Sequence, residues 1–131
     1  MKLTVTIKYG IRMLSLLSKT KNRINTRKIA KIMGVSPLYL RQIALPLEKR
    51  GFIKSFRGKN GGYALAKSPD KIKIISIFNA YNEGVELSEC ITHPNICKNT
   101  PNCETRKFLI EISNNLKEML RNKTIADITK P

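Results

Sequence analysis

Apolar residues recur at every third or fourth position over residues 6–18, which is the spacing of one face of an α-helix. Ile7, Ile11 and Leu14 form the centre of this face, and neighbouring leucines and a methionine widen it. A polar and basic stretch follows over residues 19–23 and predicts a turn. The chain is therefore expected to begin with an amphipathic helix that packs on a core.

A second, shorter helix is predicted over residues 27–33. Thr26 is a suitable N-cap, because its hydroxyl can accept a hydrogen bond from the first turn of the helix. Gly34 stands where the helix should end, since glycine readily takes the left-handed conformation that follows many helix C-termini. A tight turn to a further helix is expected at this glycine.

A third helix is predicted from Ser36 to about Arg50. Ser36 suits the N-cap, and Pro37 suits the first helical position, where its missing N–H costs nothing. Gly51 predicts the end of the helix. Pro46 lies inside this pattern and should kink or shorten the last turn, because proline cannot donate the helical hydrogen bond.

The next segment predicts two strands joined by a basic, glycine-rich tip. The strands are expected over residues 52–56 and 63–66, and the tip between them is RGKNGG, residues 57–62. Its glycines let the backbone approach a phosphate chain or enter a minor groove, and Arg57 and Lys59 add positive charge. The alternative is an exposed, flexible hairpin whose basic residues have no binding role.

Two helices joined by a tight turn and followed by such a hairpin are typical of a winged helix-turn-helix. In that arrangement the start of the second helix of the pair faces base edges in the major groove of DNA. Arg41 could bind guanine and Gln42 adenine, or either could hold a phosphate instead. Tyr39 suits the core as well as a phosphate. The candidate DNA contacts are Thr26, Ser36, Leu38, Tyr39, Arg41, Gln42, Arg57, Gly58 and Lys59.

The last part of the chain predicts one long helix between two short elements. Residues 72–81 are expected to form a helix, or a strand and a helix, against the base of the hairpin. Residues 104–121 have helical spacing, and Thr124 and Asp127 have the spacing of a capping box that begins a final helix. The apolar face of the long helix packs on its own domain or forms a dimer interface. This face contains Phe108, Ile112, Leu116 and Met119, widened by Leu109 and Leu120.

The expected fold class is mainly α with a small β-hairpin wing, a winged helix-turn-helix extended by a long C-terminal dimerisation helix. Three parts follow from the pattern: a DNA-binding domain over residues 1–82, a cysteine-rich sensor loop over residues 83–103, and the dimerisation helix and tail over residues 104–131. A loop that directly precedes the long helix could shift that helix when a ligand orders the loop. That coupling would form an order–disorder switch on DNA affinity.

Cys90, Cys97 and Cys103 are the three cysteines of the chain, and all lie in the sensor loop. Thiolates are soft ligands that suit iron–sulfur clusters and zinc. The wide gaps between the cysteines favour a loop wrapped around a cluster over a compact zinc site. The surrounding Pro, Asn and Thr residues predict an irregular loop that could be disordered without a metal.

A fourth ligand for the cluster or metal would have to come from outside the cysteines. His93, the single histidine, would complete a Cys₃His site for zinc or for a cluster, and Glu104 is a comparable candidate. An external thiol or water could also fill the position. Without any cofactor, the cysteines could instead respond by reversible oxidation, favoured by the basic surroundings.

Charge narrows the choice of partner. The 131 residues include 25 Lys and Arg against 9 Asp and Glu, so the net charge is +16 and the pI about 10.1. Such an excess favours nucleic acid, with an anionic membrane surface second, although codon bias toward lysine would also raise it. A basic RNA-binding module is the remote alternative. Catalysis is not expected, because one histidine and no clustered carboxylates offer little machinery.

No secretory signal and no apolar stretch long enough to span a membrane are present, so a cytoplasmic protein without membrane association is expected. Hydrophobic residues make up 41% of the chain, which is typical of a globular protein. In a reducing compartment, three clustered thiols argue against a disulfide framework. They favour a metal site or a redox-active site.

The chain resembles the IscR/NsrR (Rrf-two) family of winged-helix transcription regulators. The resemblance rests on the run SPLYLRQI-LPLEKRGFIKSFRGKNGGYALAK, on the Tyr-Gly pair near the start and on the three downstream cysteines. It implies a homodimer that binds double-stranded promoter DNA. In cluster-bearing members it also implies a two-iron or four-iron cluster held by the three cysteines, whose state controls DNA binding.

Carried over residue by residue, the resemblance places Ser36, Leu38, Arg41, Arg57 and Gly58 at positions that face DNA. In IscR the position of Arg41 holds a base-discriminating carboxylate, so a different target sequence is expected.

The fourth cluster ligand departs from the family as well. IscR uses a histidine where this chain has Arg106, and NsrR uses an aspartate of the partner subunit where it has Lys8. Neither charged side chain is a usual iron ligand.

Overall fold

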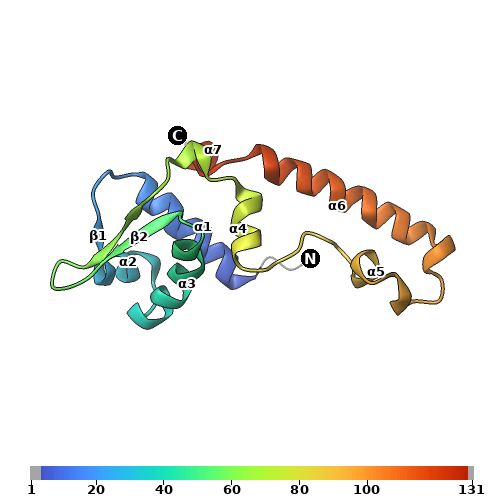
Figure 1. Cartoon of the computed structure of the whole chain (residues 1–131), viewed down its shortest axis with the longest axis horizontal. Helices are drawn as coiled ribbons and strands as arrows, with labels where there is room; N and C mark the ends of the chain where they lie inside the picture. Colours follow the sequence, from blue (N-terminus) through green and yellow to red (C-terminus); the bar gives the residue numbers. More distant parts are fainter. Residues whose placement is uncertain (1–3, 130–131) are drawn as a thin grey trace.

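The structure is a computed structural model, and residues 4–129 are described. Helices dominate, and one small antiparallel sheet lies at one end of a helical body (Figure 1). The elements in chain order are α1 (Val5–Ser18), β1 (Ile24–Asn25), α2 (Thr26–Met33), α3 (Pro37–Lys49), β2 (Ile53–Phe56), β3 (Gly62–Leu65), α4 (Ile74–Ala80), α5 (Glu89–Thr92), α6 (Glu104–Asn122) and α7 (Ile125–Thr129), with single 3₁₀ turns at Pro69–Lys71, Pro94–Ile96 and Thr100–Asn102. The predicted fold class is confirmed.

Local capping explains where the two helices of the helix-turn-helix begin and end. The prediction that Thr26 caps α2 was wrong: Asn25 is the N-cap, and its side chain accepts a hydrogen bond from the Arg27 N–H. Asparagine is at least as good a cap as threonine, and the strand before it fixes its extended backbone. Gly34 ends α2 in the left-handed conformation, and the Ser36 hydroxyl caps α3, both as predicted.

Pro46 does not end α3. The helix runs through it to Lys49, and Arg50 forms the C-cap. A proline late in a helix removes one backbone hydrogen bond, and the buried side chains around it compensate for that loss. Ile43, Ala44 and Leu47 are all fully buried on this face of α3.

The sheet has the strand order β1-β3-β2, and both pairings are antiparallel. The hairpin β2–β3 was predicted, but the two-residue strand β1 was not, because residues 24–25 show no alternating pattern. β1 pairs with Gly62 and Tyr63 of the central strand. A Cβ atom on Gly62 would overlap the carbonyl oxygen of Ile24. This glycine therefore serves the sheet itself rather than an approach to phosphate.

The core of the body is formed by apolar faces of α1 to α4 and the inner face of the sheet. The chain returns to this body at its C-terminal end, where the backbone N–H of Ile125 donates to the carbonyl of Ile72 over 3.0 Å. Thr124 and Asp127 form the predicted capping box, since each accepts a bond from the other's backbone N–H. Ile125 is fully buried, and α7 packs against α1.

Residues 83–122, here called the arm, project from the body (Figure 1). The chain runs outward through residues 83–103, forms the short helix α5, and returns along α6, which packs against α4 and α5. The cysteine segment is more regular than expected, because helical turns occupy most of residues 89–102. The long helix spans nearly the predicted residues.

The segment over residues 72–81 forms α4, preceded by a single bridge between Lys73 and Thr124. α4 packs mainly on α1, α3 and α6, so it lies between the body and the arm rather than chiefly at the base of the hairpin. Within residues 4–129, no helix is long and apolar enough to cross a lipid bilayer.

Candidate nucleic-acid interface and cysteine site

A groove of about 850 Å³ lies between the two helix-turn-helix helices and the hairpin. Its walls come from the start of α2, from one face of α3 and from the hairpin tip. The lining residues are Asn25, Thr26, Arg27, Pro37, Arg41, Ser55, Phe56, Arg57, Gly58, Lys59, Gly61, Gly62 and Tyr63. Four cations, and no carboxylate, are among these residues, so the groove suits an anionic chain.

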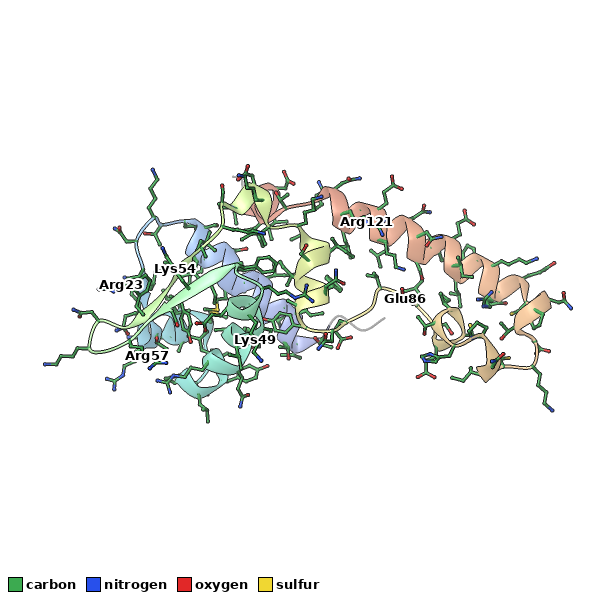
Figure 2. The ribbon with its side chains drawn as sticks, in the orientation of Figure 1. Arg23, Lys49, Lys54, Arg57, Glu86 and Arg121 are labelled. Atoms are coloured by element: carbon green, nitrogen blue, oxygen red, sulfur yellow. The ribbon has the colours of Figure 1, made fainter. Side chains whose placement is uncertain are left out.

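The positive charge of the protein is confined to the part that forms this groove. Residues 1–82 contain 18 Lys and Arg against two acidic residues, whereas residues 83–131 contain seven of each. Figure 2 shows the labelled Arg23, Lys54 and Arg57 gathered at the sheet end of the body, away from the arm. The whole net charge of +16 therefore belongs to the body, and the arm and tail are neutral overall.

The structure brings five of the nine predicted DNA contacts to the groove, namely Thr26, Arg41, Arg57, Gly58 and Lys59. Leu38 and Gln42 are exposed on α3 outside it, and Leu38 is 65% exposed. The Ser36 hydroxyl is engaged with the Tyr39 N–H as a helix cap.

Tyr39 packs its ring edge-on to Tyr9 at 5.9 Å, so it is partly a core residue. Four groove residues with polar side chains were missed by the sequence analysis, namely Asn25, Arg27, Ser55 and Tyr63. Their contribution depends on how the strands and helices meet.

Side-chain contacts fix the hairpin against α3 and against the segment before β1. The Ser55 hydroxyl donates to the Glu48 carboxylate over 2.8 Å, which joins β2 to the end of α3. Burial, and then the nearby Glu48 charge, raises the pKa of Tyr63, while Arg41 acts in the opposite direction. The Arg23 guanidinium stacks on the Phe56 ring at 4.8 Å across the sheet. The groove is therefore built on fixed walls.

The three cysteines lie at the far end of the arm in different surroundings. Cys103 is the N-cap of α6, where its sulfur accepts the backbone N–H of Arg106 over 3.4 Å. Cys90 is half-buried, with its sulfur 3.2 Å from the Ser88 hydroxyl, and Cys97 is exposed. Over the part of the chain that the structure describes, no three metal-ligating side chains are gathered around one point.

One buried group next to the cysteines, the Thr100 hydroxyl, has no hydrogen-bond partner among residues 4–129. Thr100 is 7% exposed, and its hydroxyl makes no hydrogen bond although it is shielded from water. Such a hydroxyl costs free energy unless something satisfies it. His93, the fourth-ligand candidate, is exposed, and its Nδ1 atom lies 3.0 Å from the Thr92 hydroxyl. The three thiols are soft donors of the type that suits an iron–sulfur cluster or zinc, but among the described residues they are not gathered around one point.

The sequence matches a known protein family over nearly its whole length. The family model described as "Rrf2: Iron-dependent Transcriptional regulator" matches residues 3–131, nearly the whole chain. The chain belongs to the Rrf2 family. The resemblance inferred from the sequence is thereby confirmed, and the protein is a transcriptional regulator of the Rrf2 type, in a family of DNA-binding proteins that are not enzymes.

Individual Rrf2 relatives agree in length and fold. The chain is 34% identical over 131 residues to the HTH-type transcriptional regulator NsrR of Geobacillus kaustophilus, covering 98% of this chain and 89% of that protein. Among solved structures, CymR, the global cysteine regulator of B. subtilis, is 27% identical with a TM-score of 0.81 over 98% of this chain and 96% of that one. IscR of T. potens is 27% identical with a TM-score of 0.74, covering 98% and 85%.

Proposed function

We propose that this Rrf2 regulator is a homodimer that binds promoter DNA through the groove and changes its DNA affinity with the state of the three cysteines. The observation that carries the proposal is that the groove and the cysteines lie in two different parts of the molecule. A basic body holds a groove lined by four cations, and a neutral arm holds all three thiols. The two parts meet at α4, which packs on both α3 and α6.

In the proposed complex, Arg41 lies nearest to base edges and the hairpin cations contact the backbone. Arg41 is the exposed, positively charged α3 residue on the groove wall, and arginine binds guanine through two hydrogen bonds. Arg57 and Lys59 extend from the hairpin tip, where a minor groove or a phosphate chain would pass. Thr26 and Arg27 sit at the start of α2, and they suit a phosphate contact.

The exposed face of α6 supports the dimer. Phe108 is 60% and Met119 52% exposed, and with the half-buried Ile112 they lie on one side of the helix. Leu120, at the edge of this face, is buried in the protomer's own core. An apolar line of this kind on a long, projecting helix suits a second copy of the same chain, related by a two-fold axis. A two-fold dimer would read two half-sites of a near-palindrome.

For the sensing step, Cys90, Cys97 and Cys103 would hold an iron–sulfur cluster, which supplies a group sensitive to iron, nitric oxide or redox state. The family's description as iron-dependent and the similarity to NsrR support this ligand, while CymR shows that the same fold also occurs in a regulator named for cysteine. His93 and Glu104 are the chain's candidates for a fourth ligand. Zinc or direct thiol oxidation are the alternatives that the same residues support.

Anaerobic purification followed by visible absorption and by iron, sulfide and zinc assays tests the ligand. The proposal expects charge-transfer absorption with iron and sulfide in similar amounts, both lost in Cys97→Ala. Colourless protein with stoichiometric zinc would replace the cluster by a Cys₃His site and make His93→Ala the next variant. Protein that stays colourless and metal-free after reconstitution with iron and sulfide would contradict the cluster and leave a thiol-responsive regulator.

A further inference from the structure

Three polar contacts join the outward-running segment of the arm, residues 83–103, to α6. Nearest the body, the Lys117 ammonium pairs with the Glu86 carboxylate at 2.6 Å. One step outward, the hydroxyl of Ser113, which is almost fully buried, accepts the Leu87 N–H over 3.1 Å. The outermost contact is the Arg106 side chain, whose Nε–H donates to the carbonyl of Cys90 over 3.0 Å. The two halves of the arm are therefore linked along their length.

Arg106 contacts two of the three cysteines at once. Its side chain binds the backbone of Cys90, and its own backbone N–H donates to the sulfur of Cys103. Residue 106 thus ties the first cysteine of the segment to the third. The Arg106 side chain is half-buried, and its Nε–H is used in the hydrogen bond to the Cys90 carbonyl.

Cys97 lies beyond the last of these contacts. It is exposed, it follows a single 3₁₀ turn, and among the contacts of the described residues its sulfur takes no part in a hydrogen bond. The neighbouring Ile96 and Lys98 are exposed as well. The segment therefore holds two thiols in fixed surroundings and one thiol in open solvent.

We propose that Arg106 is a positioning residue that fixes Cys90 and Cys103 in the ligand-free protein and leaves Cys97 as the thiol that incoming ligands meet first. The order is the one in which the three thiols react, with Cys97 first. Its role in regulation rests on the proposed function, whereas the order of reaction does not. A soft metal ion or a thiol-reactive molecule would bind Cys97 first and would then find two prearranged sulfurs. Because the site is prearranged, ligand binding would not have to fold the whole arm.

The test is the alkylation rate of each cysteine in the full-length, reduced and metal-free protein. N-ethylmaleimide is the probe, and peptide mass spectrometry follows the three sites separately, without DNA or iron. In the wild type, Cys97 should react fastest. In Arg106→Ala, the rate at Cys90 should rise about fivefold, the factor expected for losing one contact. The rates at Cys97 and Cys103 should stay unchanged, because Cys103 is bound by the backbone N–H of residue 106, which the variant keeps.

Lys107→Ala is the matched control, because it removes one exposed positive charge from the next residue of α6. Loss of a positive charge by itself disfavours the reactive thiolate, so a rise at Cys90 in Arg106→Ala that is absent in Lys107→Ala identifies release of the Arg106 side-chain contact. The thermal unfolding midpoint of each variant is measured in parallel.

Two results would overturn the assignment of Arg106. One is an unchanged pattern of alkylation rates in Arg106→Ala. The other is an equal rise at all three cysteines together with a lower unfolding midpoint, which would mean general loosening of the arm. Since the measurement contains no cluster and no DNA, its failure is separate from failure of the proposed function.

Discussion

The hydroxyl of Tyr81 donates a hydrogen bond to the backbone carbonyl of Ile43 over 2.6 Å. Tyr81 caps the C-terminal end of α4, immediately before the arm, and Ile43 lies in the middle of α3. Burial of the phenol raises the pKa of Tyr81, so the hydroxyl stays protonated and able to donate. A second link runs in parallel, because the Arg50 guanidinium donates to the Asn79 carbonyl over 3.2 Å. The end of α4 therefore holds the groove helix at two points.

Replacing Tyr81 by phenylalanine removes only the hydroxyl. We expect the free energy of unfolding to fall by about 1 kcal/mol, the usual net value of one buried hydrogen bond. Tyr9→Phe is the control, because the Tyr9 ring contacts Tyr39 and two cations but its hydroxyl makes no hydrogen bond among those of the described residues. Urea denaturation of both variants checks this. Equal stability of Tyr81→Phe and the wild type would mean that the contact contributes nothing.

The Tyr81 ring packs against the backbone of Gly10 in α1. A Cβ atom at residue 10 would lie 2.5–2.9 Å from three atoms of the Tyr81 side chain, including its hydroxyl oxygen. Gly10→Ala should therefore destabilise the protein by about 1–3 kcal/mol through overpacking.

A double-mutant cycle with Tyr81→Leu assigns the cost of Gly10→Ala to its neighbour. The smaller side chain should remove most of the penalty, since the two residues are in contact and their effects should not add. If the two changes add within error, the penalty arises elsewhere in α1.

These two contacts show which parts of the structure were accessible from the sequence. Helices α1, α2, α3 and α6 and the hairpin follow from apolar spacing, caps and glycines, which act over a few neighbouring residues. The pairing of Gly10 with Tyr81, or of Tyr81 with Ile43, joins residues more than 30 positions apart. Patterns over a few neighbouring residues do not predict contacts of this kind. For the same reason β1 was missed, since its two residues become a strand only because β3 lies beside them.

Some residues of the candidate site could likewise be predicted from the sequence, and others depend on long-range contacts. Arg41, Arg57 and Lys59 could be chosen from the sequence, because residue type and position in the helix or hairpin suffice. Arg27 entered the groove only because β1 places the start of α2 against the hairpin. The cysteines were identified from composition, but the exposure of Cys97 and the role of Arg106 depend on how the arm folds back on itself.

Arg57→Ala tests the groove. We expect DNA affinity to fall by roughly 5- to 100-fold and the slope of log affinity against log salt to decrease by about one, as for the loss of one cationic contact. Lys71→Ala is the matched control, because Lys71 is an exposed cation of the same body outside the groove lining. Fluorescence anisotropy over a range of salt concentrations measures both. Equal losses in the two variants would show that net charge, and not the groove, drives binding.

The Lys117–Glu86 ion pair should make the stability of the arm depend on pH. The hydrogen bond from Lys117 lowers the pKa of Glu86 below its usual range, against the opposing effect of burial. A lowered pKa contributes stability above the ordinary glutamate pKa of about 4.3, and this stability is lost as the pH falls through the lowered value. Lys117→Gln should reduce this contribution, because the backbone hydrogen bonds that also lower the pKa of Glu86 remain.

Urea denaturation at several pH values compares Lys117→Gln with the wild type. The two proteins should differ in stability at neutral pH and converge in acid. Lys107→Gln, which removes an exposed cation without a carboxylate partner in the described structure, should show no such convergence. A difference between Lys117→Gln and wild type that is the same at every pH would contradict the ion-pair account.

Thr100→Val should stabilise the ligand-free protein. The change keeps the shape of the side chain and removes the buried hydroxyl that has no partner, which is worth about 1 kcal/mol or more. Thr100→Ser, which keeps the hydroxyl and removes the methyl group, should be less stable than the wild type. Thermal unfolding of the metal-free proteins gives the order. A valine variant less stable than the wild type would show that the hydroxyl already has a partner.

The measurement that tests the central claim most directly is DNA affinity as a function of the cysteine ligand. Duplexes selected from a random pool by the anaerobically purified protein are titrated with three samples: that protein, the same protein stripped by a chelator, and Cys97→Ala. We predict a change in affinity of about tenfold or more between the first two samples, as for a typical allosteric coupling, and no response to stripping in Cys97→Ala. Equal affinity of loaded and stripped protein for every selected duplex would contradict the claim that the arm regulates the groove.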